Sequence, residues 1–497
     1  MTQDPISYGA RLRQLAAERG TAEAVRFLPA RGEEQSLSWA ELDAMTDRFA
    51  RALAARGVGQ GAIVGFALPN IPAHLALALA IWRVGATTMV LDPGIHPETA
   101  QAMKARSGAA LVIGREAGQG DITLAEFITL ADGLPRTPVE DKISVPGKIV
   151  LSGGSTGLPK MMCDTRPFAR IPGQSWGRVA PSLGFRCEQT QLVCAAMSHN
   201  APFTWAQNGL FEGNRLVLME HFDAVAVLQA IDRFEIGFAM VVPTMMVRMI
   251  DHFEESGATL ESLHALYHTG APCARWLKQA WIDRLGPERV TEMYGSGENT
   301  GQTVISGAEW LRHPGSVGCG FETEIRIYGE AGEILPPGEV GEIFMRPGDP
   351  DGRSNYFGSD APQPRRDGDG FQSIGDLGWL DAEGYLYLSG RRDDVINTGG
   401  VKVHPETIEA VLLTHPQIAD AVAFGIEDRE WGQKVVAVLV AKPGACPSVD
   451  ALHDFCAEHL SRAETPKVFR LCETLPRDGF GKIRRRMLAV KLAQEEI

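Results

Sequence analysis

The sequence predicts an α/β protein, with a large N-terminal domain of βαβ-type sheets that includes a β-rich subdomain, and a small α+β C-terminal domain. Three observations predict this. Buried-strand patterns alternate with helical patterns from Leu37 onward, short segments broken by turn residues replace them around residues 331–387, and a new alternation begins after Arg391. With 497 residues the chain can form more than one core, because single cores stop growing near about 250–300 residues. We place the boundary between domains 1–390 and 391–497.

The first elements follow βαβ order. Ser38 and Glu41 have the spacing of a capping box, apolar residues recur at helical spacing through Leu53, and Gly57 ends this helix. The elements expected after it are a strand at 63–67, a helix at 73–83, and strands at 88–91, 148–151, 217–219, 239–242 and 265–268.

The later elements have a different texture. Turn signals such as Gly332 and Pro336-Pro337-Gly338 separate short alternating segments, which predicts hairpins of a β-rich subdomain. The C-terminal domain is expected to contain a helix at 405–413, strands at 421–425 and 435–440, and a helix at 449–460.

Charge and cysteine content exclude several classes of protein. The formal net charge of -14 disfavours nonspecific attraction to nucleic acid or to anionic membranes. The eight cysteines show no CxxC spacing, which indicates reduced thiols and neither a zinc cluster nor a disulfide framework. The most apolar region, 71–91, is interrupted by His74 and Arg83, and the N-terminus lacks a signal peptide's apolar centre. We expect a soluble, cytoplasmic protein without a membrane span or a nucleic-acid partner.

The most informative stretch is the run Ser152-Gly153-Gly154-Ser155-Thr156-Gly157-Leu158-Pro159-Lys160. Glycines let backbone amides approach phosphate oxygens, and the hydroxyls and the lysine supply further donors. A Walker loop would have Ser or Thr directly after the lysine, whereas Met161 stands there. The run therefore predicts a phosphate-binding loop of another type.

Four further motifs follow this loop in order. They are Tyr294-Gly295-Ser296-Gly297-Glu298, Gly375-Asp376-Leu377, Gly390-Arg391-Arg392-Asp393-Asp394 and Gly481-Lys482-Ile483. Together with the loop, they resemble the adenylate-forming (AMP-binding) superfamily of acyl-CoA synthetases, luciferases and nonribosomal peptide adenylation domains. The resemblance covers most of the chain, and five ordered motifs are much harder to obtain by chance than one.

The resemblance implies an acid–CoA ligase that uses ATP, Mg²⁺ and coenzyme A. A carboxylate resists acyl transfer, so it is first joined to AMP, which leaves easily. That step requires positioned phosphates, a metal and a mobile cation, and it requires no nucleophilic side chain. The resemblance also implies that the C-terminal domain is a mobile lid that swings about Asp393.

The resemblance assigns ATP-binding roles residue by residue. Glu298 would hold Mg²⁺, a hard cation that prefers oxygen ligands. Gly297 stands where many relatives carry threonine, so a contact from that hydroxyl is absent. Adenine would contact Tyr294 with Gly295, and the segment Gly270, Ala271 and Pro272. The ribose or a phosphate would contact Asp376 and Arg391. The residues expected to bind the phosphates are Ser152, Gly153, Gly154, Ser155, Thr156, Gly157 and Lys160.

Two segments of the C-terminal domain would serve the two steps of the reaction, which are the joining of the acid to AMP and the transfer of the acyl group to CoA. Lys482 matches the lysine that bridges the carboxylate and the α-phosphate, although Asp478 replaces the small polar residue usual three positions before Gly481. Gly399 and Gly400 match the route of the pantetheine thiol, and they are equally compatible with a plain turn.

The acyl group would bind at Ser198-His199-Asn200-Ala201-Pro202-Phe203, which matches the substrate segment of relatives. His199, Asn200 and Phe203 are the candidate contacts, although His199 also fits a hydrogen-bonded core residue. The texture of residues 304–318 resembles ligases for bulky alicyclic acids such as steroid or bile acids. We therefore expect a hydrophobic, bulky alicyclic acid.

Two alternatives stay open at this point. A stand-alone adenylating enzyme would pass the acyl group to a carrier protein, and sequence does not separate this from CoA because both acceptors present the same pantetheine arm. A non-catalytic nucleotide-binding sensor is the alternative of another class, and the presence of Lys482, Glu298 and Asp376 speaks against it.

Overall fold

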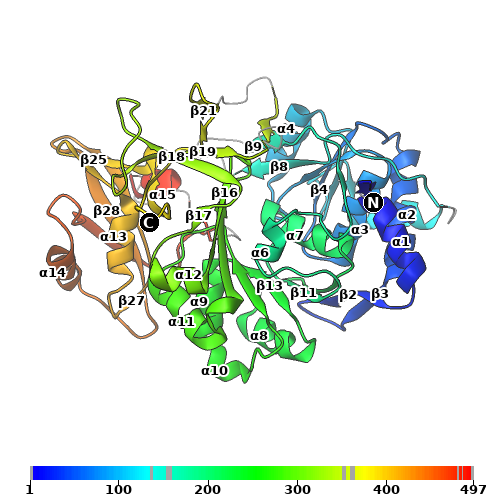
Figure 1. Ribbon diagram of the computed structural model, residues 1–497, viewed down its shortest axis with the longest axis horizontal. Coiled ribbons are helices and arrows are strands. Elements are labelled where there is room, and N and C mark those ends of the chain that lie inside the picture. The colour runs from blue at the N-terminus through cyan, green and yellow to red at the C-terminus, as the bar shows by residue number, and fades with distance from the viewer. Residues whose placement is uncertain are drawn as a thin grey trace. The chain divides into compact units, whose positions relative to one another are not determined.

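The computed structural model describes residues 4–134, 138–152, 159–349, 354–358, 364–477, 481–483 and 485–493. The chain divides into a first unit, Met1–Arg312 with Pro347–Gln363, and a second unit, His313–Arg346 with Pro364–Ile497. Helices and sheets occur in both units, which confirms the predicted α/β class (Figure 1). The predicted boundary at residues 390–391 falls inside the second unit and stays a prediction. Within the described ranges, no helix is long and apolar enough to cross a membrane.

One sheet of the first unit contains the strands around the predicted phosphate loop. Its central strands β8, β5, β4 and β6 run parallel, and β9 and β20 are added antiparallel at one edge. In spatial order the strands are β20 (Asn355–Tyr356), β9 (Lys160–Cys163), β8 (Lys148–Ser152), β5 (Thr87–Val90), β4 (Ile63–Ala67), β6 (Leu111–Gly114) and β7 (Ile122–Thr123).

A second sheet of the first unit is also mostly parallel, as expected for βαβ connections. In spatial order its strands are β16 (Gln302–Ser306), β15 (Val290–Gly295), β14 (Ala265–His268), β13 (Phe238–Val241), β11 (Thr190–Val193), β12 (Arg215–Met219), β2 (Glu23–Leu28) and β3 (Gln35–Ser38). A short ribbon pairs β1 (Ile6–Ser7) with β10 (Ala169–Arg170).

The main core of the first unit lies between these sheets. It joins apolar side chains of β4 and β6 to those of β2 and β12 through α3 and α7, and α3 is buried along almost its whole length. The helices of this unit are α1 (Tyr8–Arg19), α2 (Trp39–Ala55), α3 (Pro72–Arg83), α4 (Pro97–Ser107), α5 (Leu124–Asp132), α6 (Val179–Ser182), α7 (Asn200–Phe211), α8 (Ala224–Arg233), α9 (Pro243–Asp251), α10 (Phe253–Ser256), α11 (Arg275–Leu285) and α12 (Gly307–Arg312).

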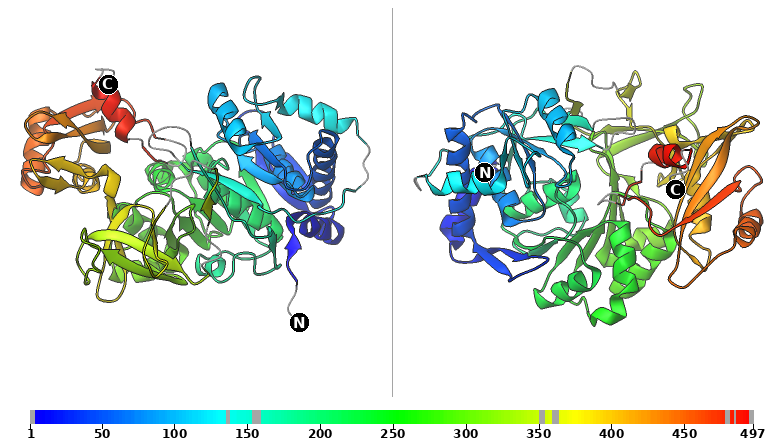
Figure 2. Two further views of the ribbon diagram at one scale, coloured as in Figure 1. Left: turned by 90° about the horizontal axis from the view of Figure 1, so that it is seen from above. Right: turned by 180° about the vertical axis from the view of Figure 1, so that it is seen from behind.

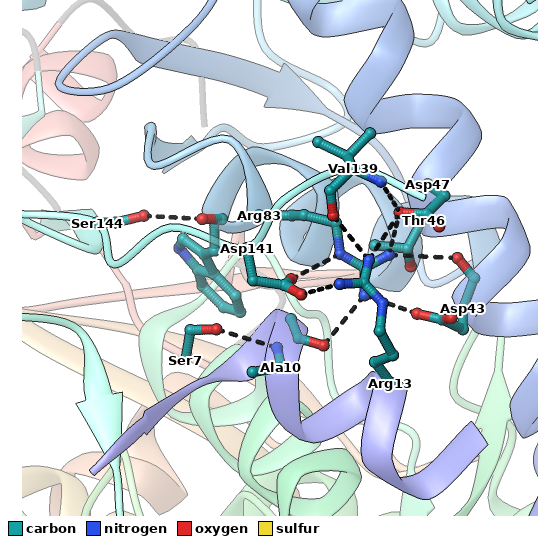
Figure 3. Close-up of polar contacts among 12 residues, drawn as sticks. Ser7, Ala10, Arg13, Asp43, Thr46, Asp47, Arg83, Val139, Asp141 and Ser144 are labelled. Atoms are coloured by element: carbon teal, nitrogen blue, oxygen red, sulfur yellow. Dashed lines mark hydrogen bonds and ion pairs between the residues drawn. The ribbon is translucent and has the colours of Figure 1, made fainter. Parts of the chain in front are cut away.

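A buried arginine connects the first helices (Figure 3). The Arg83 guanidinium, at the end of α3, is fully buried and forms ion pairs with Asp43 at 2.6 Å, Asp47 at 2.7 Å and Asp141 at 2.9 Å. It also donates a hydrogen bond to the Gly9 carbonyl at 3.1 Å. A buried charge is tolerated only when it is paired and hydrogen-bonded, and this cluster meets that condition with residues of α1, α2 and the 139–144 segment.

The second unit contains two further sheets and the C-terminal helices. Helix α15 packs on β27 through Leu488, and both views of Figure 2 show the red helix beside the orange strands. The strands of these two sheets are β18 (Thr323–Tyr328), β19 (Gly341–Pro347), β21 (Arg365–Arg366), β22 (Gln372–Ser373), β23 (Asp376–Leu380), β24 (Leu386–Arg391), β25 (Ile396–Thr398), β26 (Val401–Val403), β27 (Ile418–Asp428), β28 (Gly432–Ala441) and β29 (Val468–Cys472). The short strand β17 (Cys319–Gly320) belongs to neither of them. The helices are α13 (Pro405–Leu412), α14 (Val449–His459) and α15 (Arg485–Ala493).

Most element predictions are confirmed, with shifts of a few residues at the ends. The capping box is present, because the Ser38 hydroxyl accepts from the Glu41 amide while the Glu41 carboxylate accepts from the Ser38 amide. The largest difference is in the C-terminal domain, where β27 and β28 are longer than predicted. They form a ladder from Ile418 to Ala441 that continues past the apolar run, since strand pairing also satisfies the backbone of polar residues.

Candidate active site

The predicted phosphate loop connects two antiparallel strands. Ser152 at the end of β8 lies opposite Lys160 at the start of β9, so the loop leaves and re-enters the sheet at one point. The predicted contacts Gly153, Gly154, Ser155, Thr156 and Gly157 lie outside the described residues. Lys160 is half-buried and is therefore available at this edge of the sheet.

The structure brings Lys160 and Glu298 together at a third residue, Tyr356. The Tyr356 hydroxyl donates a hydrogen bond to the Glu298 Oε1 at 2.8 Å, and the Lys160 Nζ lies 5.8 Å from the centroid of the same ring. Strand β20 brings Tyr356 to this place by pairing with β9, opposite Met162. The Ser354 amide also donates to the Glu298 carbonyl at 3.1 Å. Two motifs that are far apart in sequence therefore meet, as the resemblance implied.

Sequence reasoning missed Tyr356. Its one signal was an aromatic pair, Tyr356-Phe357, within a stretch that is otherwise rich in Gly, Asp, Pro and Arg. An aromatic residue in such a polar segment is a candidate for a buried anchor, because loops otherwise have few apolar groups to hold them.

The Glu298 carboxylate fits a magnesium ion that is bound mainly through phosphates. Mg²⁺ keeps several waters and uses one or two carboxylates together with substrate phosphates. Glu298 is half-buried and offers hard oxygen atoms beside Lys160. Within the described ranges, no group of three or more His, Cys, Asp or Glu side chains is placed to hold a metal alone. In this setting Mg²⁺ would neutralise charge on the departing pyrophosphate.

Packing explains why a glycine stands at position 297. A Cβ at this position would lie 2.8 Å from the Met162 Cε and 3.6 Å from the Val150 Cγ1. The first distance is shorter than side-chain contacts allow, so a threonine here would require the flexible end of the Met162 side chain to move. The loop before Glu298 therefore packs directly on β8 and β9.

The predicted adenine segments lie side by side. Strands β14 and β15 are parallel neighbours with His268 opposite Glu292, so Gly270 and Tyr294 both follow that pair by two residues. The Thr269 hydroxyl donates to the Met293 carbonyl at 2.7 Å and joins the two strand ends. In open α/β sheets, ligands bind outside the carboxyl ends of the strands. The two segments share that edge, and Gly270 has a φ of 91°, which favours glycine.

Buried charges lie next to this edge of the sheet. The Lys278 ammonium contacts the Glu292 carboxylate at 2.6 Å, and His268 lies 3.9 Å from the same carboxylate. Burial lowers the pKa of His268 to about 4, so the ring is neutral at physiological pH.

In the second unit, the two ribose candidates form a pair. Asp376 and Arg391 are cross-strand partners in β23 and β24, and the Arg391 Nε lies 3.1 Å from the Asp376 Oδ1. Asp376 is buried whereas Arg391 is 59% exposed, so the carboxylate is held in place while the guanidinium reaches solvent. Asp393, the predicted hinge, is exposed in the short 3₁₀ turn Arg392–Asp394.

Gly399 and Gly400 form the turn of the β25–β26 hairpin. Their φ values of 57° and 81° are both in the left-handed region, which two-residue hairpin turns require. The Gly399 amide donates to the Trp431 carbonyl at 2.8 Å, and a Cβ on Gly399 would lie 2.8 Å from the Trp431 ring. The plain-turn interpretation is therefore correct for the backbone, and the thiol route stays a prediction.

Lys482 is exposed, and contacts within the second unit hold the residues around it in place. Arg477 forms a backbone bridge with Ile483, donates to the Gly481 carbonyl at 2.9 Å and pairs with Asp420. The following helix is fixed by Arg485, which contacts Asp394 at 3.0 Å, Glu406 at 3.1 Å and Glu409 at 2.9 Å. Asp478 lies outside the described residues.

The predicted substrate residues begin α7, and each has a different environment. His199 precedes the helix and is half-buried. The Asn200 Oδ1 accepts a hydrogen bond from the Lys148 Nζ at 2.8 Å. Phe203 is 3% exposed and packs among the aromatic rings of His74 and Trp82, so it contributes to the core.

The chain matches a known family in both of its parts. The sequence model of the AMP-binding enzyme family matches residues 12–348, and that of the AMP-binding enzyme C-terminal domain matches residues 407–482. A 2-succinylbenzoate–CoA ligase from Bacillus thuringiensis subsp. konkukian is 29% identical over 465 residues, which are 92% of this chain and 94% of the relative.

Two solved structures of o-succinylbenzoate CoA synthetase from Bacillus subtilis have the same fold. The complex with the acyl-adenylate intermediate is 26% identical, with a TM-score of 0.82 and coverage of 98% of both chains. The complex with ATP and magnesium ion is 25% identical, with a TM-score of 0.80 and coverage of 98% of this chain and 100% of the other. The chain therefore belongs to the AMP-binding enzyme family, as an acid–CoA ligase that uses ATP, Mg²⁺ and CoA and forms an acyl-adenylate.

Proposed function

We propose that this ligase activates a ring-bearing, hydrophobic carboxylic acid that binds along the first turn of α7. The observation that carries this proposal is that side chains on one face of β8 contact both the Glu298 loop and α7. Val150 on that face lies beside Gly297 and hence beside the Glu298 loop, and Lys148 on the same face holds Asn200 of α7. One strand therefore links the phosphate-binding end of the site to the predicted acid-binding segment.

The names of the relatives support the proposal that the acid contains a ring. Their printed names give 2-succinylbenzoate as the acid, which has an aromatic ring, and the bulky alicyclic acids expected from residues 304–318 share a rigid ring body. Both classes need an apolar enclosure. The aromatic side chains of Trp176, Phe185 and Trp205 pack close to the α7 segment and supply such surroundings.

In the first half-reaction, an oxygen of the acid attacks the α-phosphorus of ATP and pyrophosphate leaves. We assign Lys160 and the loop to the β and γ phosphates, Glu298 to Mg²⁺, Tyr294 and residues 270–272 to adenine, and Asp376 with Arg391 to the ribose. Tyr356 holds the Glu298 carboxylate and keeps its orientation. Lys482 neutralises the two anions before they bond.

In the second half-reaction, the CoA thiol attacks the acyl carbonyl and AMP leaves. Gly399 and Gly400 would border the path of the pantetheine arm, because a turn without side chains allows a thin chain to pass close to the backbone. Asp393 would permit the change between the two steps, as hinges concentrate rotation in a few residues at element ends.

Pyrophosphate release tests the acid class directly. The panel contains 2-succinylbenzoate, 3-benzoylpropionate (the same skeleton without the ring carboxylate), benzoate, cholate, heptanoate and palmitate. We expect the highest kcat/KM with a ring-bearing acid. Preference for heptanoate or palmitate over every ring-bearing acid would contradict the proposal. Thioester formation with free CoA is followed in parallel, and AMP rather than ADP is the expected product.

A further inference from the structure

The backbone around Lys482 is fixed on both sides, although the lysine side chain itself is exposed. On the N-terminal side, the Arg477 guanidinium donates to the Gly481 carbonyl at 2.9 Å, and Arg477 forms a backbone bridge with Ile483. On the C-terminal side, α15 begins at Arg485, three residues after the lysine. The place of Lys482 therefore depends on what these two arginines contact.

Arg485 contacts three carboxylates that come from two separate segments. Its guanidinium lies 3.0 Å from Asp394, 3.1 Å from Glu406 and 2.9 Å from Glu409, and its side chain is only 15% exposed. The Arg485 Nε also donates to the Ala423 carbonyl on β27 at 3.1 Å. Hydrogen bonds between a guanidinium and carboxylates are strong and fix the geometry of both partners. The start of α15 is therefore connected to the turn that contains Asp394, to α13 and to β27.

The carboxylates depend on Arg485 for their charge balance. Burial raises the pKa of Glu409 to about 7 and also raises the pKa of Glu406, whereas the charge of Arg485 lowers both. Arg477 acts on Glu409 as well, but it is already paired with Asp420 at 2.7 Å. Removing one member of a buried ion cluster leaves uncompensated charge. Without Arg485, the carboxylates would repel one another and the start of α15 would lose its attachment.

One of these contacts lies directly beside the hinge candidate. Asp394 follows Asp393 in the same 3₁₀ turn, so Arg485 joins the lysine segment to the residue at which a rotation of the lid would begin. Glu406 packs against Gly390, just before this turn, where a Cβ would collide with the Glu406 carboxylate. The attachment through Arg485 therefore makes the lysine segment move with the hinge as one body.

We propose that Arg485 is a positioning residue for Lys482, which holds the start of α15 against Asp394 and α13 so that the lysine meets the acid and the α-phosphate in the first half-reaction. This rests on the role proposed for Lys482 and goes beyond it, because Arg485 acts through the lysine rather than on a substrate. A displacement of about 1 Å at a reacting group can cost about a hundredfold in rate. The second half-reaction does not use Lys482, so it should not depend on Arg485 in this way.

Arg485→Met tests the proposal in single-turnover measurements of each half-reaction. The acid is the member of the pyrophosphate panel that the wild type activates best, so the result does not depend on which acid class is correct. We expect formation of the acyl-adenylate to slow by about tenfold or more, and conversion of supplied acyl-AMP to the thioester to change by less than about threefold. Arg485→Lys should recover part of the first rate, because an ammonium can still pair with the carboxylates.

A double variant separates positioning from a merely structural role. If Arg485 acts through Lys482, the combination of Lys482→Ala and Arg485→Met should form the acyl-adenylate no more slowly than Lys482→Ala alone, because the lysine to be positioned is already absent. Losses that multiply in the double variant would show that Arg485 supports the fold or another group, which overturns the inference.

Controls address folding. Arg346→Met removes another arginine of the second unit that pairs with a carboxylate, Glu324, at 2.7 Å, and it should leave both half-reactions unchanged. Asp394→Asn removes the charge beside the hinge while two carboxylates still neutralise Arg485. It should slow the first half-reaction by about threefold, which keeps the test informative if Arg485→Met folds poorly. Melting temperatures of all variants are compared with the wild type.

The outcomes distinguish this inference from the proposed function. Equal slowing of both half-reactions in Arg485→Met would overturn the inference, as would an unchanged first half-reaction. No recovery in Arg485→Lys would show that ion pairing does not hold α15, which also overturns it. Failure of the proposed acid class would instead appear in the wild type, as a preference for heptanoate or palmitate, and would leave the comparison of the variants unaffected.

Discussion

At the scale of single residues, the candidate site contains contacts between charged side chains and their polar or aromatic neighbours. Tyr356 is the clearest case, because its hydroxyl contacts Glu298 and its ring lies near Lys160. A hydrogen bond to a charged group contributes about 1.5–3 kcal/mol, roughly twice a neutral one. Glu298 and Lys160 were predictable from motifs, whereas the tyrosine that joins them was not.

Removing this hydroxyl tests its role. Tyr356→Phe should lower kcat/KM for ATP by about tenfold or more, because Glu298 loses the partner that orients its carboxylate. Pyrophosphate–ATP exchange, measured over a range of Mg²⁺ concentrations, checks this. Tyr328→Phe removes a similar hydroxyl–carboxylate contact, to Asp367 at 2.6 Å, and serves as the matched control. Equal effects of the two changes would count against a role for Tyr356 at the site.

Arg83 provides a residue-scale prediction for stability. Arg83→Met leaves Asp43, Asp47 and Asp141 near one another without the shared cation, so the free energy of unfolding should fall by about 3–5 kcal/mol. Urea unfolding measures it. Arg48→Met removes an exposed ion pair with Asp132 and should cost less than about 1 kcal/mol. A loss below that of the control would show that the cluster is not stabilising.

At the scale of elements, sequence patterns located strands and helices but did not pair them. The run at 148–151 predicted β8, and its parallel partner β5 was also predicted. The addition of β20 to β9 was not, because Asn355–Tyr356 has no strand pattern of its own. Its pairing arises from backbone hydrogen bonds that a free sheet edge offers to any extended segment.

The contact between the Glu298 loop and β9 can be tested by restoring the missing threonine. Gly297→Thr should lower kcat/KM for ATP by about threefold, because the Met162 methyl that the new side chain meets ends a flexible side chain and can move aside. Adding Met162→Ala removes the obstructing Cε and should recover part of the loss. Pyrophosphate–ATP exchange is the assay. If the double variant is no better than Gly297→Thr alone, the steric explanation is wrong.

At the scale of the whole molecule, the predicted site residues are divided between two units. Lys160, Glu298 and the adenine segments belong to the first unit, whereas Asp376, Arg391, the Gly399–Gly400 turn and Lys482 belong to the second. The second unit is tied internally through Arg485, which connects α15 to α13 and to Asp394 beside the hinge candidate.

The two half-reactions should respond differently to the loss of one lysine. Lys482→Ala should reduce formation of the acyl-adenylate by about a hundredfold or more, because two anions then meet without a neutralising cation. Conversion of supplied acyl-AMP to the thioester should be nearly unaffected. Single-turnover measurements of each step check this, with Lys467→Ala as an exposed control. Equal losses in both steps would contradict the division of labour.

Acidic pH should lower the stability of the folded protein through two buried histidines. Burial lowers the pKa of His74 and of His268 to about 4, below the value near 6.5 expected in the unfolded chain. The unfolded state then binds more protons between those values, so stability rises with pH from about 4 to 6.5 and is lost on acidification. Urea unfolding at pH 7 and pH 5 measures this, and His268→Gln should reduce the difference. An unchanged difference would show that His268 is not the titrating group.

The sequence by itself determined the order of the main elements, because helix caps and buried-strand runs are local patterns. Its ordered motifs carried the resemblance that implied the superfamily, the reaction and the charged groups of the site. The tertiary structure decided which of them meet. It placed Tyr356 against Glu298, Gly297 against Met162, and Lys148 against Asn200. These contacts join positions tens to more than a hundred residues apart. Local propensity carries no information about them, since they depend on how the sheets pair and on which face each strand presents to its neighbours.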